Sequence, residues 1–520
     1  MKVMLPVLLI SWITTHETYD SSLPVSPISD TTKPSISGDL ERSRSFFPLI
    51  GKIYSDHAKK NNIPGISFAI VMEGRLVYSG SYGHTDLAKK IPVTTSSVFR
   101  IASMSKSFTA MAILKLRDEG KLKLDDPASN YIPELKNTVY PSKDSEPITI
   151  RHLLTHGAGF PEDNPWGDRQ LSDSDKELSD FISRQISFST SPGTAYEYSN
   201  LGFAMLGRIV TKVSGKPYQQ YIRENIWMPL RMKSAAWEYT DVPAERLAHG
   251  YRWQEGQWIE EPLLHDKADG SWGAMGSMLS SAEEYAPYMA LHLSAWPPSD
   301  DIESGPVKRS SIREMQHPWR FSGLNAQYTY PGGRPCAMAS AYCYGLRWSR
   351  DCEGRTYIAH SGGLPGFGSH WQVMPEFGIG VVAMGNRTYA PMSVVNLQVL
   401  DTLIRLAGLK PRPIPVSGIL QQRRNELMKY VQEWNGTEQS GIFAENFFPD
   451  NPLPILRKRS LEIFGSAGRI LSIGEMKAEN NLRGTFIIQC EQKDLEIYFT
   501  LSPENPPLIQ EYRIRELSRK

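Results

Sequence analysis

The sequence has few cysteines, little net charge and only one short hydrophobic run near its start. Its 57 Lys and Arg residues nearly balance its 56 Asp and Glu residues, which leaves a formal net charge of +1. This balance argues against the broad basic face of a nucleic-acid-binding protein and against a strongly acidic tail. We therefore expect the partner to be a small-molecule or short-peptide substrate, and we expect no nucleic acid.

Cysteine is scarce, with four residues in the whole chain. Cys336, Cys343 and Cys352 lie close together in the sequence, and Cys490 is remote from them. No histidine stands beside them at a zinc-finger spacing, so we expect no metal site and no cofactor. A disulfide requires an oxidising compartment. Buried free thiols are the interpretation that we favour.

The hydrophobic run near the N-terminus, Val3–Ile13, is too short to cross a bilayer as a helix. Lys2 precedes it and polar residues follow, which is the order found in secretory signals. The sequence shows no Ala-x-Ala cleavage site, and the alternative is an N-terminal strand or helix that packs on the domain. We expect export to a periplasm or to the medium, with no stable membrane span; a cytoplasmic location is the alternative.

The length of 520 residues exceeds what one hydrophobic core usually serves, so two folded domains are expected. Residues 1–45 are predicted to be a signal peptide followed by a flexible leader rich in Ser, Thr and Pro. Residues 46–408 form the first predicted domain, and a proline-punctuated linker occupies 409–418. The second domain is expected over 419–520.

Strand patterns occur at both ends of the first predicted domain. Ile66–Val71 and Leu76–Ser81 flank a Glu-Gly turn and predict a hairpin. Arg355–His360, Ser369–Met374 and Ile379–Met384 alternate with turn residues, as in an antiparallel meander. With helices between them, these strands predict one α+β domain whose sheet is completed by both ends of the segment.

The segment after the linker predicts a small α+β unit. A helix is expected around Ile419–Trp434, and strand-like runs occupy Arg469–Ile473, Gly484–Cys490 and Leu495–Leu501. No catalytic set is found in this unit, and we expect it to support the first domain or to control substrate access.

Ser103 and Lys106 form the Ser-x-x-Lys motif of the chain, at the start of a helix predicted over Ser103–Glu119. Three residues make about one helical turn, so the amine can reach the hydroxyl. A serine hydroxyl is a weak nucleophile until a neighbour removes its proton, and a partly desolvated lysine can do so. Alone, the motif fits equally a capping serine followed by a solvated lysine.

Further motifs follow in a recognisable order. Phe99–Ala110, which contains Ser103 and Lys106, then Tyr198–Asn200 and His360–Gly362 resemble the three motifs of serine β-lactamases and penicillin-binding proteins. The chain is similar to the class C β-lactamase-like branch, which includes D-alanyl-D-alanine carboxypeptidases, D-aminopeptidases and esterases. Further segments support the resemblance: Ile63–Val71, His152–Pro161, Gly273–Glu284 and Tyr344–Trp348.

The resemblance implies the fold and the roles of several residues. It implies an antiparallel sheet flanked by helices, with an all-helical lobe, followed here by the small α+β accessory domain. Tyr198 takes the place of the general base, and Asn200 that of the asparagine that contacts the lysine and the acyl side chain. A phenol is a poor base at neutral pH, but the nearby Lys106 is expected to favour its ionised or hydrogen-bonded form.

The third motif is expected to hold the substrate. Gly362 and Gly363 let a substrate lie along the backbone beside Ser361 like an added strand. The resemblance implies that the oxyanion hole consists of the backbone N–H groups of Ser103 and Gly363. As single features, Tyr198 also fits a core aromatic residue, and the His-Ser-Gly-Gly run also fits a simple strand end.

One position departs from class C β-lactamases, which carry lysine in the third motif where this chain has His360. Histidine is shorter and only partly charged near neutral pH, so it is a poorer partner for a substrate carboxylate. We expect a serine hydrolase that acts through an acyl-enzyme on a D-amino-acid-containing peptide or a small ester. A β-lactamase is the alternative, and a penicillin-binding sensor that does not turn over is the alternative from another class.

Overall fold

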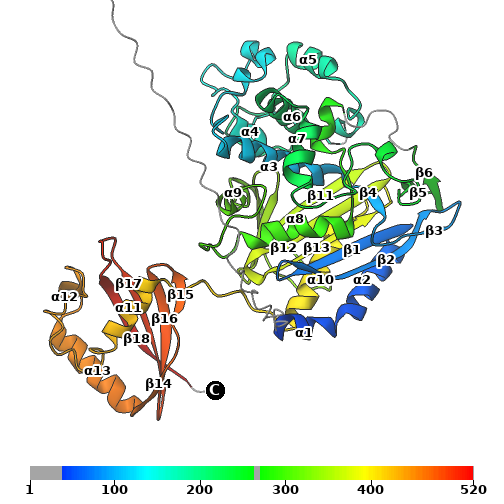
Figure 1. Cartoon of the computed structure of the whole chain (residues 1–520). Coiled ribbons are helices and arrows are strands. Elements are labelled where there is room, and N and C mark those ends of the chain that lie inside the picture. Colours follow the sequence, from blue (N-terminus) through cyan, green and yellow to red (C-terminus); the bar gives the residue numbers. More distant parts are fainter. Residues whose placement is uncertain (1–37, 165, 263–269, 519–520) are drawn as a thin grey trace, which may run out of the picture.

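A nine-stranded antiparallel sheet is the centre of the larger unit (Figure 1). The computed structural model describes residues 38–164, 166–262 and 270–518, and the predicted signal and most of the leader lie outside the described residues. The strands follow the order β3 (Ile91–Pro92), β2 (Arg75–Asp86), β1 (Gly65–Met72), β13 (Ile379–Gly385), β12 (Phe367–Met374), β11 (Thr356–Leu364), β10 (Arg347–Asp351), β9 (Met338–Tyr342) and β8 (Arg320–Asn325).

The two ends of this unit meet in the middle of the sheet. β1 pairs antiparallel with β13 from Ile66 opposite Gly385 to Met72 opposite Ile379. The predicted hairpin is β1 with β2, and the predicted meander is β11, β12 and β13. The expected α+β architecture is therefore confirmed.

Side chains alternate between the two faces of the sheet, as the two-residue period of a strand requires. In β1, Phe68 and Ile70 belong to one hydrophobic cluster, and Ala69 and Val71 belong to another. Both faces are covered by helices, so every residue of β1 and β13 is buried. The near-continuous apolar run of these strands follows from this double burial.

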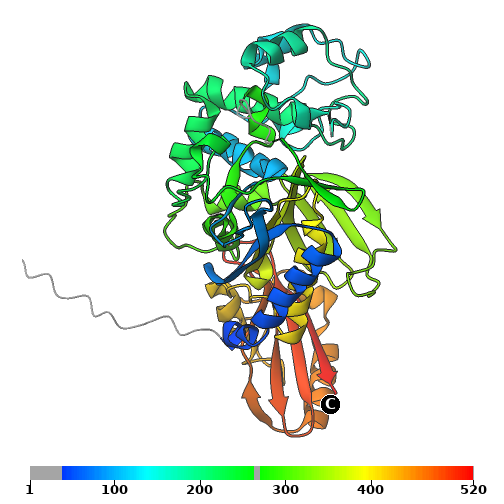
Figure 2. The same ribbon diagram turned by 90° about the vertical axis from the view of Figure 1, so that its right-hand side faces the viewer.

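Helices cover the two faces as separate layers (Figures 1 and 2). One face packs against α2 (Phe47–Lys60) and α10 (Met392–Leu406), with α1 (Gly38–Arg44) beside them. The other face carries α8 (Ala282–Ser294) and the helical lobe. The lobe contains α3 (Ser105–Asp118), α4 (Ile150–Leu154), α5 (Asp175–Ser183), α6 (Asn200–Ser214), α7 (Tyr218–Ile222) and α9 (Arg309–Met315).

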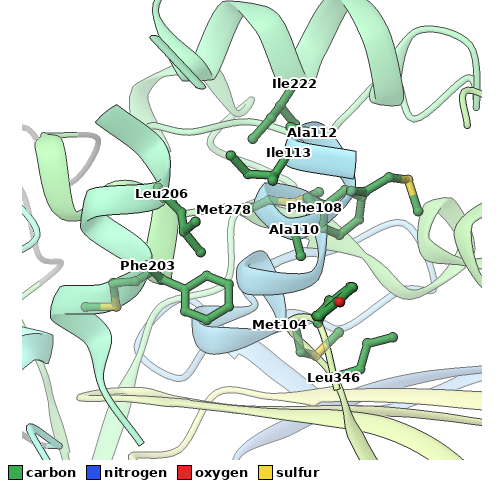
Figure 3. Packing of buried hydrophobic residues seen from close by; sticks show 14 of the residues in the cluster. Met104, Phe108, Ala110, Ala112, Ile113, Phe203, Leu206, Ile222, Met278 and Leu346 are labelled. Carbon is green, nitrogen blue, oxygen red and sulfur yellow. The ribbon is translucent and has the colours of Figure 1, made fainter. Parts of the chain in front are cut away.

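Helix α3 lies at the centre of the largest hydrophobic cluster. Eleven of its 14 residues are buried, including the polar residues of its first turn. Phe108 packs among side chains from neighbouring elements, and Figure 3 shows Phe203 and Leu206 of α6 beside the same helix. Burying a side chain such as Phe108 stabilises the fold by about 1.5 to 3 kcal/mol. The motif on α3 is therefore held by a rigid core.

The helix begins later than predicted. The α-helical part starts at Ser105, and Ala102–Met104 form a 3-10 turn. The backbone N–H of Met104 donates to the carbonyl of Ile101 at 3.2 Å, a three-residue step that tightens the chain. Ser103 therefore lies in the turn that precedes the helix.

Two small sheets of two strands each complete the larger unit. β4 (Val98–Arg100) pairs with β7 (Leu279–Ser281), and β5 (Tyr251–Gln254) pairs with β6 (Gln257–Glu260). β4 leads into the Ser103 turn, and β7 leads into α8. The pairing of β4 with β7 therefore brings the turn and the start of α8 together.

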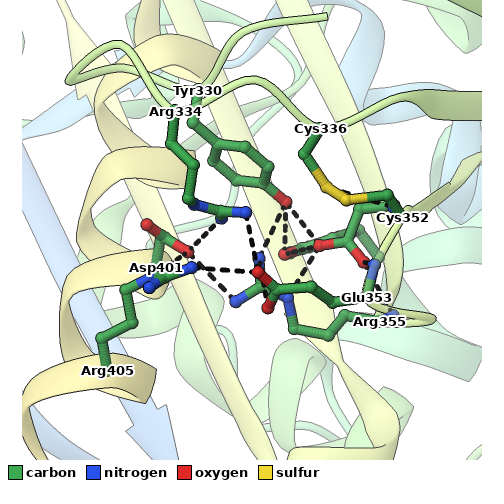
Figure 4. A network of polar contacts seen from close by, with 10 residues as sticks. Tyr330, Arg334, Cys336, Cys352, Glu353, Arg355, Asp401 and Arg405 are labelled. Atoms are coloured by element: carbon green, nitrogen blue, oxygen red, sulfur yellow. Dashed lines mark hydrogen bonds and ion pairs between the residues drawn. A yellow bond between two sulfur atoms is a disulfide. The ribbon is translucent and has the colours of Figure 1, made fainter. Parts of the chain in front are cut away.

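A disulfide joins Cys336 and Cys352, which corrects the expectation of free thiols at these two positions; Cys343 and Cys490 are buried and form no disulfide. The sequence spacing of 16 residues did not show that β9 and β10 bring the ends of this segment together. The disulfide lies beside a network of charged and phenolic side chains (Figure 4). At its centre the buried Asp351 carboxylate accepts hydrogen bonds from the Arg355 guanidinium at 2.7 Å and from the Tyr330 hydroxyl at 2.7 Å.

The C-terminal unit has a hydrophobic cluster of its own, drawn from residues 420–514. Its helices are α11 (Gly418–Leu427), α12 (Phe447–Asp450) and α13 (Leu453–Ala467); its strands are β14 (Ile470–Ile473), β15 (Lys477–Asn480), β16 (Arg483–Cys490), β17 (Asp494–Leu501) and β18 (Ile509–Leu517). The strands form one antiparallel sheet in the order β14, β16, β17, β18, with β15 also paired to β16. The expected α+β accessory unit is present. Its helix α11 ends at Leu427, before the predicted end at Trp434.

Candidate active site

Ser103 is held by its neighbours in a strained turn. Ala102 has a φ of +50°, a left-handed conformation that non-glycine residues seldom adopt. The Ser105 hydroxyl donates to the Ala102 carbonyl at 2.7 Å and accepts from the Met278 backbone N–H at 3.1 Å. Ser103 is 8% exposed, and its side chain lines a cavity. The fold therefore presents this one hydroxyl to solvent at the start of a buried helix.

Lys106 is fully buried, and its amine reaches three acceptors. Nζ donates to Ser103 Oγ at 2.9 Å, to Asn200 Oδ1 at 2.6 Å and to the Met275 carbonyl at 2.8 Å. Burial lowers the pKa of Lys106 to about 7, although Asp163 and Asp168 favour the charged form. A large fraction of the lysine is therefore neutral near pH 7, in contact with the serine.

Asn200 begins helix α6, and the helix end fixes its position. The Ser199 side chain caps this end. Asp163 accepts from the backbone N–H groups of Asn200 at 2.6 Å and Leu201 at 2.8 Å, which suits a carboxylate at a helix N-terminus. The Asn200 amide donates to Asn164 Oδ1 at 2.6 Å. Asn200 thus links Lys106 to the loop at the cavity wall.

Tyr198 lies beside both residues of the first motif. The Lys106 amine is 4.9 Å from the centre of its ring, and its hydroxyl forms a hydrogen bond with Ser103. Burial raises the pKa of Tyr198 well above its ordinary value, and the hydrogen bond with Ser103 opposes this only in part. Of the two forms that the sequence analysis allowed, the structure therefore favours the neutral, hydrogen-bonded form. The reason is that burial penalises the phenolate more than the hydrogen bond with Ser103 and the charge of Arg347 stabilise it.

His156 contacts the second motif through both its ring and a hydrogen bond. Its ring centre is 4.3 Å from that of Tyr198, and its Nδ1 accepts from the Ser199 backbone N–H at 3.0 Å. Its φ of +52° is again a strained value. The ring contact with Tyr198 and the hydrogen bond to Ser199 therefore help to hold the second motif in place.

His360 lies on β11 and is fully engaged by protein groups. Its Nδ1 donates to the Ser361 carbonyl at 2.6 Å, so in the neutral ring Nε2 accepts from the Tyr342 hydroxyl at 3.0 Å. Burial lowers the pKa of His360 well below its ordinary value, and Arg347 and Lys106 lower it further. His360 is therefore neutral at pH 7. The sequence analysis expected this histidine to be partly charged near neutral pH, and burial removes that charge.

The rest of the third motif forms an open strand edge at the cavity. Among the described residues, β10 pairs with β11 only as far as Ala359, so Ser361, Gly362 and Gly363 have no strand on that side. A Cβ on Gly362 would overlap the Ile101 carbonyl oxygen, which ties this strand to the segment before Ser103. The strand edge and the serine are therefore held close together by backbone contact.

A cavity of about 460 Å³ brings the predicted residues together. Its lining includes Ser103, Tyr198 and the segment 360–363 from the sequence prediction; the remaining lining residues are Asn164, Asp168, Arg347, Ser369 and the segment 389–393. Lys106 and Asn200 reach the cavity through Ser103 and Asn164, respectively. All the predicted site residues thus lie at one place, and their roles stay predictions.

Sequence reasoning missed Arg347, Asp168 and Tyr389. The Tyr389 hydroxyl donates to Asp168 at 2.9 Å at the cavity wall. Neither residue belongs to a motif, and only the folded chain brings them to the site. Arg347 had a signal, because it stands within the Tyr344–Trp348 segment that supports the resemblance.

The described residues contain no cluster of three or more His, Cys, Asp or Glu side chains that could hold a metal ion. Over the same ranges, no helix is both long and apolar enough to cross a membrane.

A family model described as Beta-lactamase matches residues 50–404, which include every residue of the three motifs. The chain belongs to the beta-lactamase family. This membership supports a serine hydrolase or a penicillin-binding-protein-like function in general terms.

Curated relatives also resemble a large part of the chain. Protein flp of Staphylococcus aureus strain MW2 is 29% identical over 354 residues, which cover 67% of this chain and 65% of that protein. Beta-lactamase-like protein 2 of Dictyostelium discoideum is 32% identical over 256 residues, or 48% of this chain and 46% of that protein. The match to protein flp thus spans about two thirds of either protein.

The fold is also found in a solved structure. The octameric penicillin-binding protein homologue from Pyrococcus abyssi is similar, with a TM-score of 0.57 and 22% identity. The similarity covers 90% of this chain and 99% of that one. The expected β-lactamase/transpeptidase fold with an additional C-terminal sheet domain is confirmed.

Proposed function

We propose that the chain is a serine hydrolase that forms an acyl-enzyme on Ser103 and acts on a D-amino-acid-containing peptide or a small ester. The observation that carries the proposal is the 2.9 Å hydrogen bond between Lys106 Nζ and Ser103 Oγ, made by a buried amine whose pKa is about 7. A base with a pKa near the working pH combines a useful neutral fraction with a real driving force for proton transfer.

Acylation starts when Ser103 Oγ attacks the carbonyl carbon of the substrate. The neutral Lys106 amine takes the serine proton, and this proton returns from Lys106 through the Tyr198 hydroxyl to the leaving group as the bond to that group breaks, so that both residues end neutral. The backbone N–H groups of Ser103 and Gly363 are the donors for the developing oxyanion. A single donor of this kind is typically worth about 2.7 to 4 kcal/mol of transition-state stabilisation.

Deacylation reverses the same proton path. Water attacks the ester carbonyl of the acyl-enzyme and gives its proton to the neutral Lys106 amine. Lys106 passes this proton to Ser103 Oγ, directly or through the Tyr198 hydroxyl, as the acyl C–O bond breaks, and Ser103 leaves as the restored hydroxyl. No step needs a metal or cofactor. His360 is neutral and bonded to protein groups, so the third motif itself does not supply the cation that class C β-lactamases have there.

The first test compares wild type with Ser103→Ala on a nitrophenyl ester, a chromogenic cephalosporin and D-alanyl peptides. We expect Ser103→Ala to lose at least roughly 10³-fold in kcat on the substrate that wild type turns over, since nucleophile removal in a serine hydrolase costs up to about 10⁶-fold. Intact-mass measurement should show an acyl adduct on wild type only.

Ser172→Ala is the matched control, because Ser172 is exposed and lies outside the cavity. Full activity of Ser103→Ala contradicts the proposal. A stoichiometric burst without further turnover on every substrate favours the penicillin-binding sensor, and preferred turnover of the cephalosporin favours a β-lactamase.

Export of the protein is a second proposal. The disulfide between Cys336 and Cys352 supports it, since such bonds persist in oxidising compartments. We expect the secreted protein to have lost a leader of the kind predicted over residues 1–45, and the mass of the protein recovered outside the producing cell measures this. Recovery of uncut protein with reduced cysteines from the cytoplasm would contradict export.

A further inference from the structure

Arg347 is a cation at the mouth of the cavity. It begins strand β10, its side chain is exposed, and it lines the cavity together with Ser103 and Tyr198. Its guanidinium carbon lies 5.5 Å from the ring centre of Tyr198 and 5.9 Å from that of Tyr342, and its side chain forms a hydrogen bond with Tyr196. The rings of Tyr198 and Tyr342 lie against the guanidinium, and Tyr196 forms a hydrogen bond with it. Three aromatic side chains thus hold the guanidinium in place.

No carboxylate of the described residues forms an ion pair with Arg347. The groups that most favour its charge are the phenols of Tyr196, Tyr198 and Tyr342. The buried Arg355, by contrast, is paired with Asp351 at 2.7 Å. An arginine that is positioned by aromatic rings and left without a carboxylate is ready to receive one from outside the chain.

The other basic groups near the serine are already in use. Lys106 donates to Ser103, Asn200 and the Met275 carbonyl, which takes all three protons of its charged form. Both ring nitrogens of His360 are bonded to protein groups, and the ring is neutral. Arg347 is the one Lys or Arg side chain among the described residues that line this cavity.

The position of Arg347 matches the open edge of β11. Arg347 pairs with Ala359, the last residue of β11 that has a partner on β10. The unpaired segment from His360 to Gly363 therefore starts beside the guanidinium. A substrate that lies along this edge with its carbonyl at Ser103 passes within reach of Arg347.

We propose that Arg347 binds a carboxylate of the substrate, and that the substrate class is therefore a peptide or ester with a free carboxylate close to the scissile carbonyl. The inference rests on the proposed function. The planar guanidinium presents paired donors that match the two oxygens of a carboxylate, which a neutral histidine at the third motif does not. Arg347 thus takes over the role that the lysine of class C β-lactamases has in the third motif.

The test uses two pairs of substrates, and the two members of each pair differ in one group. Acetyl-D-alanyl-D-alanine and its C-terminal carboxamide are compared, together with a pair of nitrophenyl esters, one ending in a carboxylate and one in a carboxamide. Wild type, Arg347→Gln, Arg347→Lys and the control Arg350→Gln are measured. Arg350 is an exposed arginine on the same strand and does not line the cavity.

We expect wild type to prefer the carboxylate member of the pair that it turns over. Arg347→Gln should lower kcat/KM for that member by roughly 10- to 100-fold, mainly through KM, as the loss of a charged hydrogen bond implies. The carboxamide should change by less than about two-fold, since it makes no charged bond to lose. Arg347→Lys should recover part of the preference, and Arg350→Gln should match wild type.

An equal loss on both members would show that Arg347 only positions Tyr198, and it would overturn the inference. Equal use of both members by wild type would overturn it as well, while the proposed hydrolase stands. Binding separates the two proposals. Acetyl-D-alanine is titrated into Ser103→Ala and into Ser103→Ala with Arg347→Gln, and weaker binding to the second supports the carboxylate site even where turnover fails. Equal binding to both overturns the inference.

Discussion

Lys106 shows how one residue gains its chemistry from burial. The sequence spacing predicted that its amine reaches Ser103, and the structure places the two atoms 2.9 Å apart. The sequence could not show that the amine is fully buried or that its pKa falls to about 7. That value depends on the whole helical lobe that packs around α3, so it appears only in the folded chain.

The pKa of Lys106 predicts how activity depends on pH. The base must be neutral, so kcat/KM should rise with pH through about 7. His156 and His360 do not account for this limb, because burial lowers the pKa of both well below 6.5. Asp168 favours the charged form of Lys106, and Asp168→Asn should therefore lower the pKa of Lys106 and move the limb to lower pH.

The measurement is the pH profile of kcat/KM from pH 5 to 9, with Asp300→Asn as a control. Asp300 is exposed and lies outside the cavity. An unchanged limb in Asp168→Asn would assign it to another group, and a limb that moves to higher pH would contradict the proposed role of the carboxylate.

Arg347 marks the limit of residue-level prediction. The motifs named eight site residues, and the structure brings all of them together. Arg347 and Asp168 reach the same cavity from β10 and from the loop after Asn164. Arg347 stands in the Tyr344–Trp348 segment of the resemblance, which gave it no role, and Asp168 stands in no motif, so only tertiary contacts connect the two residues to Ser103.

At the scale of elements, the alternating pattern of the strands was sufficient to predict the hairpin and the meander. The start of helix α3 was not predictable from the sequence. The turn that precedes it is shaped by hydrogen bonds of the Ser105 side chain, one of them with Met278, which is distant in the sequence. The disulfide was missed for a similar reason, since the pairing of β9 with β10 brings its cysteines together.

Strand β11 offers a test of how the elements hold the site. A Cβ at Gly362 would overlap the Ile101 carbonyl oxygen and press on Ser369. Gly362→Ala should therefore push β11 away from the Ser103 turn and destabilise the fold by about 1 to 3 kcal/mol, as overpacking does. We expect activity to fall much further than stability, because in the proposed mechanism the backbone N–H groups of Ser103 and Gly363 must both face the oxyanion.

Gly323→Ala on β8 is the matched control. The nearest atom to its added Cβ is Ser340 Oγ at 3.7 Å, an ordinary contact. Urea unfolding gives the stability and the nitrophenyl ester gives the activity. A Gly362→Ala variant as stable and active as Gly323→Ala would show that the contact between β11 and the turn does not position the site.

At the scale of the whole molecule, the proline-rich segment predicted a boundary between two domains. The structure shows how each end of this linker is attached to the unit beside it. The Arg412 backbone N–H donates to the Glu376 carbonyl at 2.6 Å, which ties the start of the linker to the larger unit. Ile414 forms an antiparallel bridge with Ala478 of the C-terminal unit. Pro413 alone separates these two attachments.

The separate hydrophobic clusters predict that the two units unfold independently. The C-terminal cluster shares no residue with the clusters of the larger unit, and the catalytic cavity draws no residue from it. We expect two calorimetric transitions for the full chain, because cooperativity requires shared burial. An activated ester that acylates Ser103 should raise the midpoint of one transition and leave the other unchanged. Ser103→Ala, which takes no acyl group, should show no shift. A single transition that moves as a whole with acylation would mean that the accessory unit and the hydrolase unit fold as one cooperative body.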